Sequence, residues 1–264
     1  MRILSFDVGG SKISYALVDE NGGLCVPAVK IKTPDNADEI EDFFKKILQE
    51  INSDGVSIAT AGVVLNDKLC GKPNNLPAGY EQIDFAKMAQ RPFLMENDAN
   101  AAMWAEFKVG ALRNVKQGVM LTLGTDVGCG LICNGTMVRG KSGAAGEISL
   151  SFSGRDMQKA AVENGLLEND CFKIYQLAQQ NVKPAQKVYQ VWEEHLVGGI
   201  KMLNRLLDTE IFALSGSLAQ IVNYDSVNAS LADLPEQNRP LVKPAQCRNE
   251  AGIIGAALLL KEKL

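Results

Sequence analysis

The segment Asp7-Val8-Gly9-Gly10-Ser11-Lys12 separates two strand-like runs, Arg2 to Phe6 before it and Lys12 to Asp19 after it. A glycine turn between two such runs predicts a β-hairpin whose tip carries few side chains. Backbone N–H groups at such a tip can approach phosphate oxygens closely, because no side chain stands in the way. The beginning of the chain therefore predicts a strand–turn–strand unit that is suited to hold a phosphate.

The same arrangement recurs at Leu123-Gly124-Thr125-Asp126-Val127-Gly128-Cys129-Gly130, which ends the apolar run from Val119. Between the two turns lies the segment Glu96-Asn97-Asp98-Ala99-Asn100. A phosphoryl transferase needs a carboxylate of this kind, because it accepts the proton of the attacking hydroxyl group. The three motifs in this order indicate phosphoryl transfer more strongly than any one of them does alone.

These motifs resemble those of the ROK family of sugar kinases, within the actin-like ATPase superfamily. The family's opening Asp-x-Gly-Gly-Thr-Lys is matched with Ser11 in place of threonine, and its Glu-Asn-Asp-Ala-Asn-Ala-Ala is matched fully from Glu96 to Ala102. Its second phosphate motif, Gly-Thr-Gly-x-Gly-x-Gly, is matched at Gly124, Thr125, Gly128 and Gly130. Asp126 replaces a glycine of that motif. The resemblance extends from residue 1 to about Leu150 and is weak after it.

The composition is that of an ordinary soluble protein, with 46% hydrophobic and 22% charged residues among 264. The net charge is −4 without a basic block, so no nucleic-acid partner is expected. No apolar stretch approaches the roughly 20 residues of a transmembrane helix, and no signal-peptide pattern is visible. We therefore expect a cytoplasmic protein without a membrane partner. The single histidine, His195, excludes a multi-histidine metal site.

Strand and helix patterns alternate twice along the chain, which predicts an α/β protein with two lobes. Strands are expected at Arg2–Asp7, Lys12–Asp19, Cys25–Thr33, Val56–Thr60, Phe93–Glu96 and Ile211–Leu214, and three more within residues 118–138. Helices are expected at residues 38–52, 98–107 and 249–264, and residues 166–207 have a helical pattern with a break at Lys183-Pro184. The resemblance implies lobes of the ribonuclease-H-like type with the active site in the cleft between them. We assign residues 1–115 and 249–264 to a small lobe and residues 116–248 to a large lobe.

Asp98 is the expected general base, because a sugar hydroxyl is a poor nucleophile until its proton is removed. The alternative is that Asp98 only caps the helix that follows it, and the full motif match favours the base. The resemblance implies that Asn97 binds a sugar hydroxyl, whereas Glu96 is expected only to support the end of its strand. Asp7, beside the first glycine turn, is expected to bind Mg²⁺ directly or through water.

The resemblance also implies where ATP binds. The backbone of Gly9, Gly10 and Ser11 faces the nucleotide phosphates, and Gly124, Thr125 and Gly128 form the second phosphate contact; Gly216 lies near the adenine. Lys12 either reaches a phosphate or points into solvent. Asp126 can adopt the turn geometry that a glycine would, because aspartate tolerates positive φ better than most residues do. Its charge should weaken ATP binding unless Mg²⁺ or Lys12 offsets it.

On the sugar side, the resemblance implies contacts from Gly62, from Asn75 in the segment Asn75-Leu76-Pro77, and from Glu147. Most members of the family hold a structural zinc ion with a histidine and three cysteines just after this glutamate. Here Leu150 occupies the histidine position, and residues 151–165 contain no cysteine. We therefore expect no zinc. The family's second sugar-binding glutamate is lost as well, and Glu163 or Glu168 could replace it.

Together these expectations describe a zinc-free ROK kinase, similar to glucokinases and N-acetylmannosamine kinases. It would use ATP and Mg²⁺ to phosphorylate a hexose or N-acetylhexosamine at the 6-hydroxyl. The alternative is a catalytically silent sugar-binding or regulatory protein. A repressor is disfavoured, because only six residues precede Asp7 and leave no room for a DNA-binding domain. A homodimer is expected only because the resemblance implies it, since members of the family commonly form homodimers.

Overall fold

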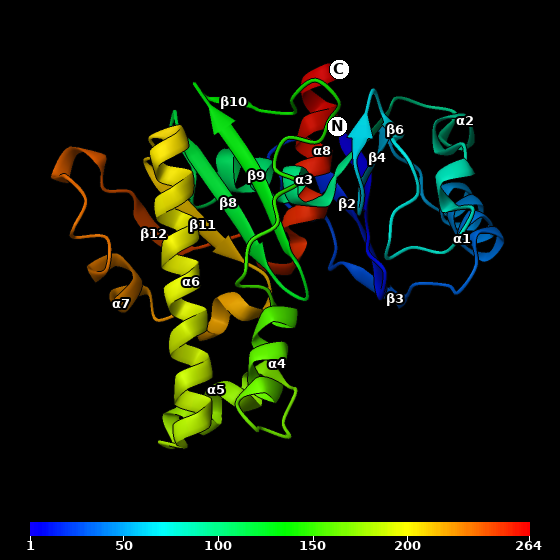
Figure 1. The fold of residues 1–264 in the computed structure, drawn as a ribbon. Coiled ribbons are helices and arrows are strands. Elements are labelled where there is room, and N and C mark those ends of the chain that lie inside the picture. Colours follow the sequence, from blue (N-terminus) through cyan, green and yellow to red (C-terminus); the bar gives the residue numbers. More distant parts are fainter. The chain divides into compact units, whose positions relative to one another are not determined.

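The computed structural model describes residues 1–264, which form two compact units. The first unit contains Met1–Arg113, Arg139–Ala145 and Cys247–Leu264, and the second contains Asn114–Val138 and Gly146–Gln246. Figure 1 shows the elements in colours that follow the sequence. The segment Arg139–Ala145 packs with the first unit, whereas the sequence analysis places it in the large lobe.

The first unit is built on a five-stranded sheet with the order β3-β2-β1-β4-β7. Its strands are β1 (Arg2–Val8), β2 (Lys12–Asp19), β3 (Val29–Lys32), β4 (Gly55–Thr60) and β7 (Phe93–Asn97). β1 pairs with β2 in antiparallel and with β4 in parallel orientation, and β4 pairs with β7 in parallel. The carboxyl ends of β1, β4 and β7 therefore meet at one edge of the sheet.

Helices cover both faces of this sheet (Figure 1). The alternation of side chains along β1 explains why. The Phe6 ring packs at 4.4 Å from that of Phe44 in α1 (Ala37–Glu50), while the hydroxyl of Ser5 donates a 2.7 Å hydrogen bond to the Ile253 carbonyl in α8 (Ala251–Lys263). α8 also packs against α3 (Asp98–Val109), so closely that a Cβ at Gly255 would collide with the carbonyl group of Ala101.

Short elements complete the first unit: the hairpin β5 (Val64–Leu65) with β6 (Lys68–Leu69), a 3-10 turn at Tyr80–Gln82, and α2 (Phe85–Ala89). The 3-10 turn Arg248–Glu250 precedes α8. The loop at residues 72–77 lies next to the tip of the β1–β2 hairpin. A Cβ atom at Gly10 would collide there with the carbonyl oxygen of Asn75.

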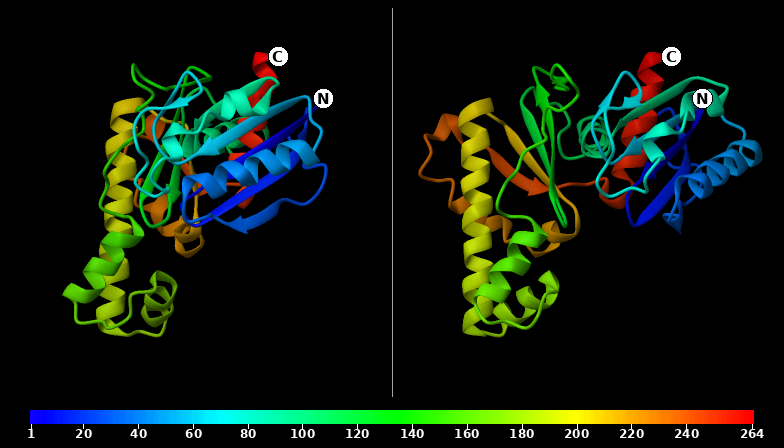
Figure 2. Two further views of the ribbon diagram at one scale, coloured as in Figure 1. Left: turned by 90° about the vertical axis from the view of Figure 1, so that its right-hand side faces the viewer. Right: turned by 45° about the vertical axis from the view of Figure 1, so that its right-hand side comes forward.

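The second unit repeats the scheme with the sheet order β10-β9-β8-β11-β12. Its strands are β8 (Gly118–Leu123), β9 (Val127–Cys133), β10 (Thr136–Met137), β11 (Ile211–Ser215) and β12 (Leu241–Pro244). Its helices are α4 (Gly154–Glu163), α5 (Cys171–Gln179), α6 (Lys183–Leu207) and α7 (Tyr224–Ala229), with 3-10 turns at Ser217–Ile221 and Glu236–Asn238. The long α6 runs along this sheet (Figure 2) and shares one apolar core with it.

The structure confirms the α/β class and most expected elements, and it corrects several of them. The expected strand Cys25–Thr33 forms only at Val29–Lys32. The expected helical region 166–207 is divided into α5 and α6 close to the predicted break, since α6 begins at Lys183. Pro184 lies in the first turn of α6, where its missing N–H does no harm. The sequence analysis missed α4 and β12. None of the helices combines the length and apolar character needed to cross a membrane.

Candidate active site

The expected catalytic residues of the first unit gather where three parallel strands end. Val8 is in register with Thr60, and Thr60 with Asn97, so Asp7, Gly62 and Asp98 lie at the same sheet edge. Burial is the main cause of the raised pKa of Asp7, and Asp98 is close enough that its charge raises this pKa as well. The topology thus brings together residues that are 91 positions apart in the sequence (98 minus 7).

Asn97, not Asp98, caps α3. Its Oδ1 accepts a 3.0 Å hydrogen bond from the N–H of Asn100, and its Nδ2 donates one of 3.0 Å to the Gly62 carbonyl. Asp98 is the first residue of the helix, and its Oδ1 accepts a 2.8 Å bond from the N–H of Ala99. The alternative that Asp98 serves as the helix cap is therefore wrong. One N–H of the Asn97 amide has no partner in these bonds and is suited to a sugar hydroxyl.

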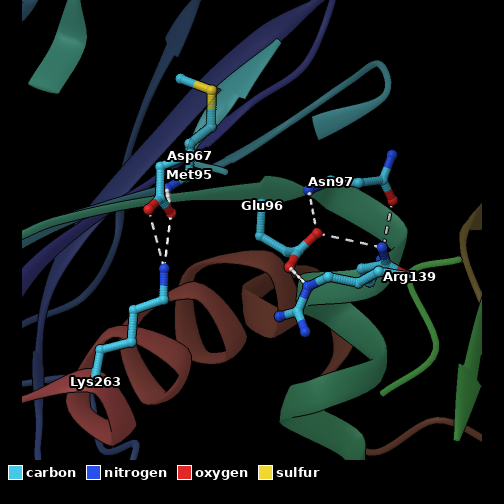
Figure 3. A network of polar contacts seen from close by, with 7 residues as sticks. Asp67, Met95, Glu96, Asn97, Arg139 and Lys263 are labelled. Carbon is cyan, nitrogen blue, oxygen red and sulfur yellow. Dashed lines mark hydrogen bonds and ion pairs between the residues drawn. The ribbon is translucent and has the colours of Figure 1, made fainter. Parts of the chain in front are cut away.

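Glu96 does more than end a strand. Its side chain is buried, and Figure 3 shows the contacts that satisfy its charge. Oε1 accepts hydrogen bonds from the N–H of Asn97 (3.0 Å) and from Nδ2 of Asn100 (3.2 Å), while Oε2 accepts one of 2.7 Å from Nε of Arg139. This ion pair holds the turn that carries Asn97 and Asp98.

The sequence analysis missed the role of Arg139. A glutamate inside an otherwise apolar strand does indicate a cationic partner, because an unpaired buried charge is costly. The sequence alone does not show which of the 27 lysines and arginines it is. Arg139 lies 43 residues away from Glu96, in the segment Arg139–Ala145 that returns to the first unit.

Asp7 has the electrostatics of a cation ligand. The pKa of its carboxyl group is raised to about 7, mainly by burial and also by the nearby charge of Asp98, while Lys12 acts to lower it. The Asp7 carboxyl group lies against α8, since a Cβ at Gly252 would lie 2.9 Å from its carbon. No group of three or more metal-ligating side chains exists. Mg²⁺ needs only one or two carboxylates together with water and phosphate, so Asp7 beside Asp98 fits this ion.

The first glycine turn is stabilised mostly through its own carbonyl groups. Thr33 donates from its hydroxyl to the Gly9 carbonyl (2.6 Å) and from its N–H to the Ser11 carbonyl (3.2 Å). Neither Gly9 nor Gly10 has a positive φ. Gly10 is required because Asn75 approaches it closely, whereas Gly62 does have a positive φ, of 101°.

Three residues that are expected to contact a ligand in the first unit are exposed to solvent. Ser11, Lys12 and Asn75 are exposed. Whether each of them touches a ligand remains a prediction.

In the second unit, the turn between β8 and β9 is held by the beginning of α4. The N–H of Gly154 donates to the Gly124 carbonyl (2.8 Å), and the N–H of Arg155 to the Thr125 carbonyl (3.3 Å). Asp126 does not adopt a positive φ, so it does not use the conformation that would favour a glycine here. Its carboxylate instead forms an ion pair of 3.1 Å with Nη1 of Arg155. The sequence analysis missed this partner, because it missed α4.

Two further expected residues lie near this turn. Gly216, at a φ of 85°, follows β11, and a Cβ there would collide with the carbonyl oxygen of Leu123 at the end of β8. Gly128 donates its N–H to the hydroxyl of Thr122 at 3.1 Å. Gly216 therefore lies beside the end of β8, where the turn with Gly124 and Thr125 begins. Glu147 is exposed.

Comparison with known proteins identifies the family and the fold. The model of the ROK family matches residues 3–150 and 150–263. A ROK family protein of Streptococcus pneumoniae in complex with sucrose is 23% identical, with a TM-score of 0.85 over 100% of this chain and 99% of that one. A ROK family glucokinase of Streptomyces griseus, in complex with glucose and AMPPNP, is 24% identical with a TM-score of 0.77, over 99% and 100%. The fold is that of the actin-like ATPases.

The chain belongs to the ROK family, since the family model covers nearly all of it. Among curated relatives, the N-acetylmannosamine kinase of Salmonella typhi is 27% identical over 291 aligned positions, which cover 98% of both chains. The expected family and fold class are confirmed.

Proposed function

We propose that this protein is an ATP- and Mg²⁺-dependent kinase that transfers a phosphoryl group to the 6-hydroxyl of a hexose or an N-acetylhexosamine. The observation that carries the proposal is the beginning of α3. Asn97 caps the helix, so Asp98 has another role at the meeting point of three strand ends, beside Asp7. The similarity to an N-acetylmannosamine kinase makes N-acetylated hexosamines the first substrates to test.

In this mechanism, Asp98 accepts the proton of the attacking sugar hydroxyl as the bond to phosphorus forms. Asp7 holds Mg²⁺, which when bound offsets the charge of the transferring phosphate. The backbone at Gly9, Gly10 and Ser11 contributes one set of phosphate contacts, and Gly124, Thr125 and Gly128 contribute the other, with Gly216 near the adenine. These residues position the nucleotide, which is the main task of a protein in phosphoryl transfer.

Gly62, Asn75, Asn97 and Glu147 are the proposed sugar contacts. Asn97 donates one amide hydrogen to the Gly62 carbonyl, which orients the amide and leaves the other hydrogen for a sugar hydroxyl. Glu147 can accept two hydrogen bonds from neighbouring sugar hydroxyls. A cytoplasmic location and a homodimer belong to the same proposal.

We also propose that the chain holds no structural zinc, because other groups fasten the segment after Glu147. The indole N–H of Trp192 donates a 2.7 Å hydrogen bond to the Phe152 carbonyl, and Nδ1 of His195 lies 2.9 Å from the Ser151 carbonyl. The Phe152 ring packs directly on Gly199 of α6, where a side chain would collide with it. Elemental analysis after dialysis should find no zinc, and about one zinc per chain would contradict this.

The direct test of the function is Asp98→Asn, which keeps the size of the side chain and removes its basicity. We expect kcat to fall roughly 10²- to 10⁴-fold, with the affinities for sugar and ATP much less changed. Asp84→Asn is the matched control. Asp84 caps α2 by accepting the N–H of Lys87 at 3.0 Å, and asparagine can still cap there. A near-normal kcat in Asp98→Asn would show that another group is the base.

The wild-type protein should first be assayed for ADP formation with a panel of hexoses and N-acetylhexosamines. Turnover with at least one of them is the expected result. Sugar binding without any turnover would instead establish the catalytically silent alternative.

A further inference from the structure

The turn between β8 and β9 carries an ion pair on the surface of the second unit. Asp126 and Arg155 lie 3.1 Å apart, with side chains that are 53% and 62% exposed. Asp126 stands where the ROK pattern has glycine, and Arg155 comes from α4, which begins against the same turn. A negative charge at a phosphate turn is unfavourable, and here a positive charge accompanies it.

The fold does not need this pair. The main chain of Gly154 and Arg155 already binds the carbonyl groups of the turn, and Ser153 with Asp156 forms a capping box at the beginning of α4. An ion pair as exposed as this one contributes about 0–1 kcal/mol to stability. Stability therefore does not explain why an arginine stands at this position.

The turn also has unused hydrogen-bond donors. Thr125 and Asp126 are exposed, and their N–H groups make no hydrogen bond within the protein. Successive N–H groups in a turn can form an anion-binding concavity. Arg155 has five N–H donors, of which the contact with Asp126 occupies the Nη1 side, so the rest of the guanidinium group is available.

We propose that Arg155 binds the phosphates of the nucleotide, and that Asp126 positions it for this task. The guanidinium group would use one edge for Asp126 and another for phosphate oxygens, together with the N–H groups of Thr125 and Asp126. Arginine suits this task because its planar fork matches phosphate geometry. The pair has no net charge, so it removes the repulsion that Asp126 alone would cause. This inference rests on the proposed function, because it adds a phosphate-binding residue to the proposed ATP site.

Titration calorimetry with ADP and with adenosine, both in the presence of Mg²⁺, tests the role of Arg155. Arg155→Gln should weaken ADP binding roughly tenfold or more, because a charge-assisted contact with phosphate is lost, and leave adenosine binding unchanged. Arg155→Lys should restore part of the affinity, since it keeps the charge without the fork. Lys159→Gln, which removes another exposed cation of α4, is the matched control and should leave ADP affinity unchanged.

The Asp126→Asn background separates direct binding from charge neutralisation. If Arg155 binds phosphate, Arg155→Gln must still weaken ADP binding when Asp126 is absent. If its effect disappears there, Arg155 only neutralises Asp126 and the inference is wrong. A wild-type protein that does not bind ADP would overturn the proposed kinase function itself. Normal ADP binding by the wild type and by Arg155→Gln would overturn only this role of Arg155.

Discussion

Each unit of this molecule carries an arginine–carboxylate pair beside a predicted functional segment, and the two pairs differ in burial. In the first unit, Arg139 binds Glu96 at 2.7 Å, with the glutamate side chain 4% exposed. In the second, Arg155 binds Asp126 at 3.1 Å, with both side chains more than half exposed. Glu96 accepts two further hydrogen bonds, whereas the exposed turn keeps donors that the protein does not use.

The difference separates two tasks of an ion pair. A buried pair whose carboxylate oxygens are all hydrogen-bonded orients the main chain, here the turn that carries Asn97 and Asp98. Removal of its arginine leaves the carboxylate charge buried without a cationic partner. An exposed pair contributes little to the fold, so its arginine is available to a ligand. The predictions below test this distinction through stability, from the largest expected effect to the smallest.

Arg139→Gln should destabilise the protein most. It leaves the Glu96 carboxylate buried with only its contacts to Asn97 and Asn100. We expect a loss of about 2–3 kcal/mol in the free energy of unfolding, somewhat below the range for a fully buried pair because the Arg139 side chain is 40% exposed. Urea unfolding at pH 7 measures it.

The double variant Glu96→Gln with Arg139→Gln is the informative control. It removes the buried charge together with its partner, so part of the lost stability should return. If the double variant is as unstable as the sum of the two single variants, Glu96 and Arg139 are not coupled and the first half of the comparison is wrong.

More of the fold than of the candidate site could be predicted from the sequence. The two glycine turns and the strand patterns around them are local features, so the two hairpins followed from them. The closeness of Asp7 and Asp98 comes instead from the parallel pairing of β1 with β4 and of β4 with β7. Arg139 and Arg155 could not be predicted in the same way. Each meets its carboxylate through tertiary packing, one through the return of the segment Arg139–Ala145 and the other through α4, and the residues of α4 carried no recognised motif.

Asp7 offers a third case, a partly buried carboxylate without an arginine. Its pKa is raised to about 7, so the native state holds this proton more tightly than the unfolded state does. Stability is therefore lost as the pH rises from about 4 to about 7. In Mg²⁺-free buffer, Asp7→Asn should be more stable than the wild type above pH 7, by an amount on the order of 1–2 kcal/mol, with no gain near pH 4. Thermal melts across this range measure it.

Asp19→Asn provides a control of opposite sign. The N–H groups of Gly23 and Asn21 hold the pKa of Asp19 below its usual value, so its charged form favours the native state. This variant should be less stable than the wild type at neutral pH, and the difference should shrink as the pH falls. A gain at pH 8 in both variants would mean that the removal of any negative charge stabilises this acidic protein, and that Asp7 is not special.

The smallest expected effect is that of Arg155→Gln on stability. Because both partners are exposed and the main chain of α4 is bound to the turn independently, the free energy of unfolding should change by no more than about 0.5 kcal/mol. Urea unfolding of Arg155→Gln and of Asp126→Asn, without nucleotide, measures this. A loss as large as that of Arg139→Gln would show that the exposed pair also supports the fold, and the contrast between the two pairs would fail. A small loss together with weakened ADP binding would establish that the two arginines, alike in chemistry, differ in task because burial differs.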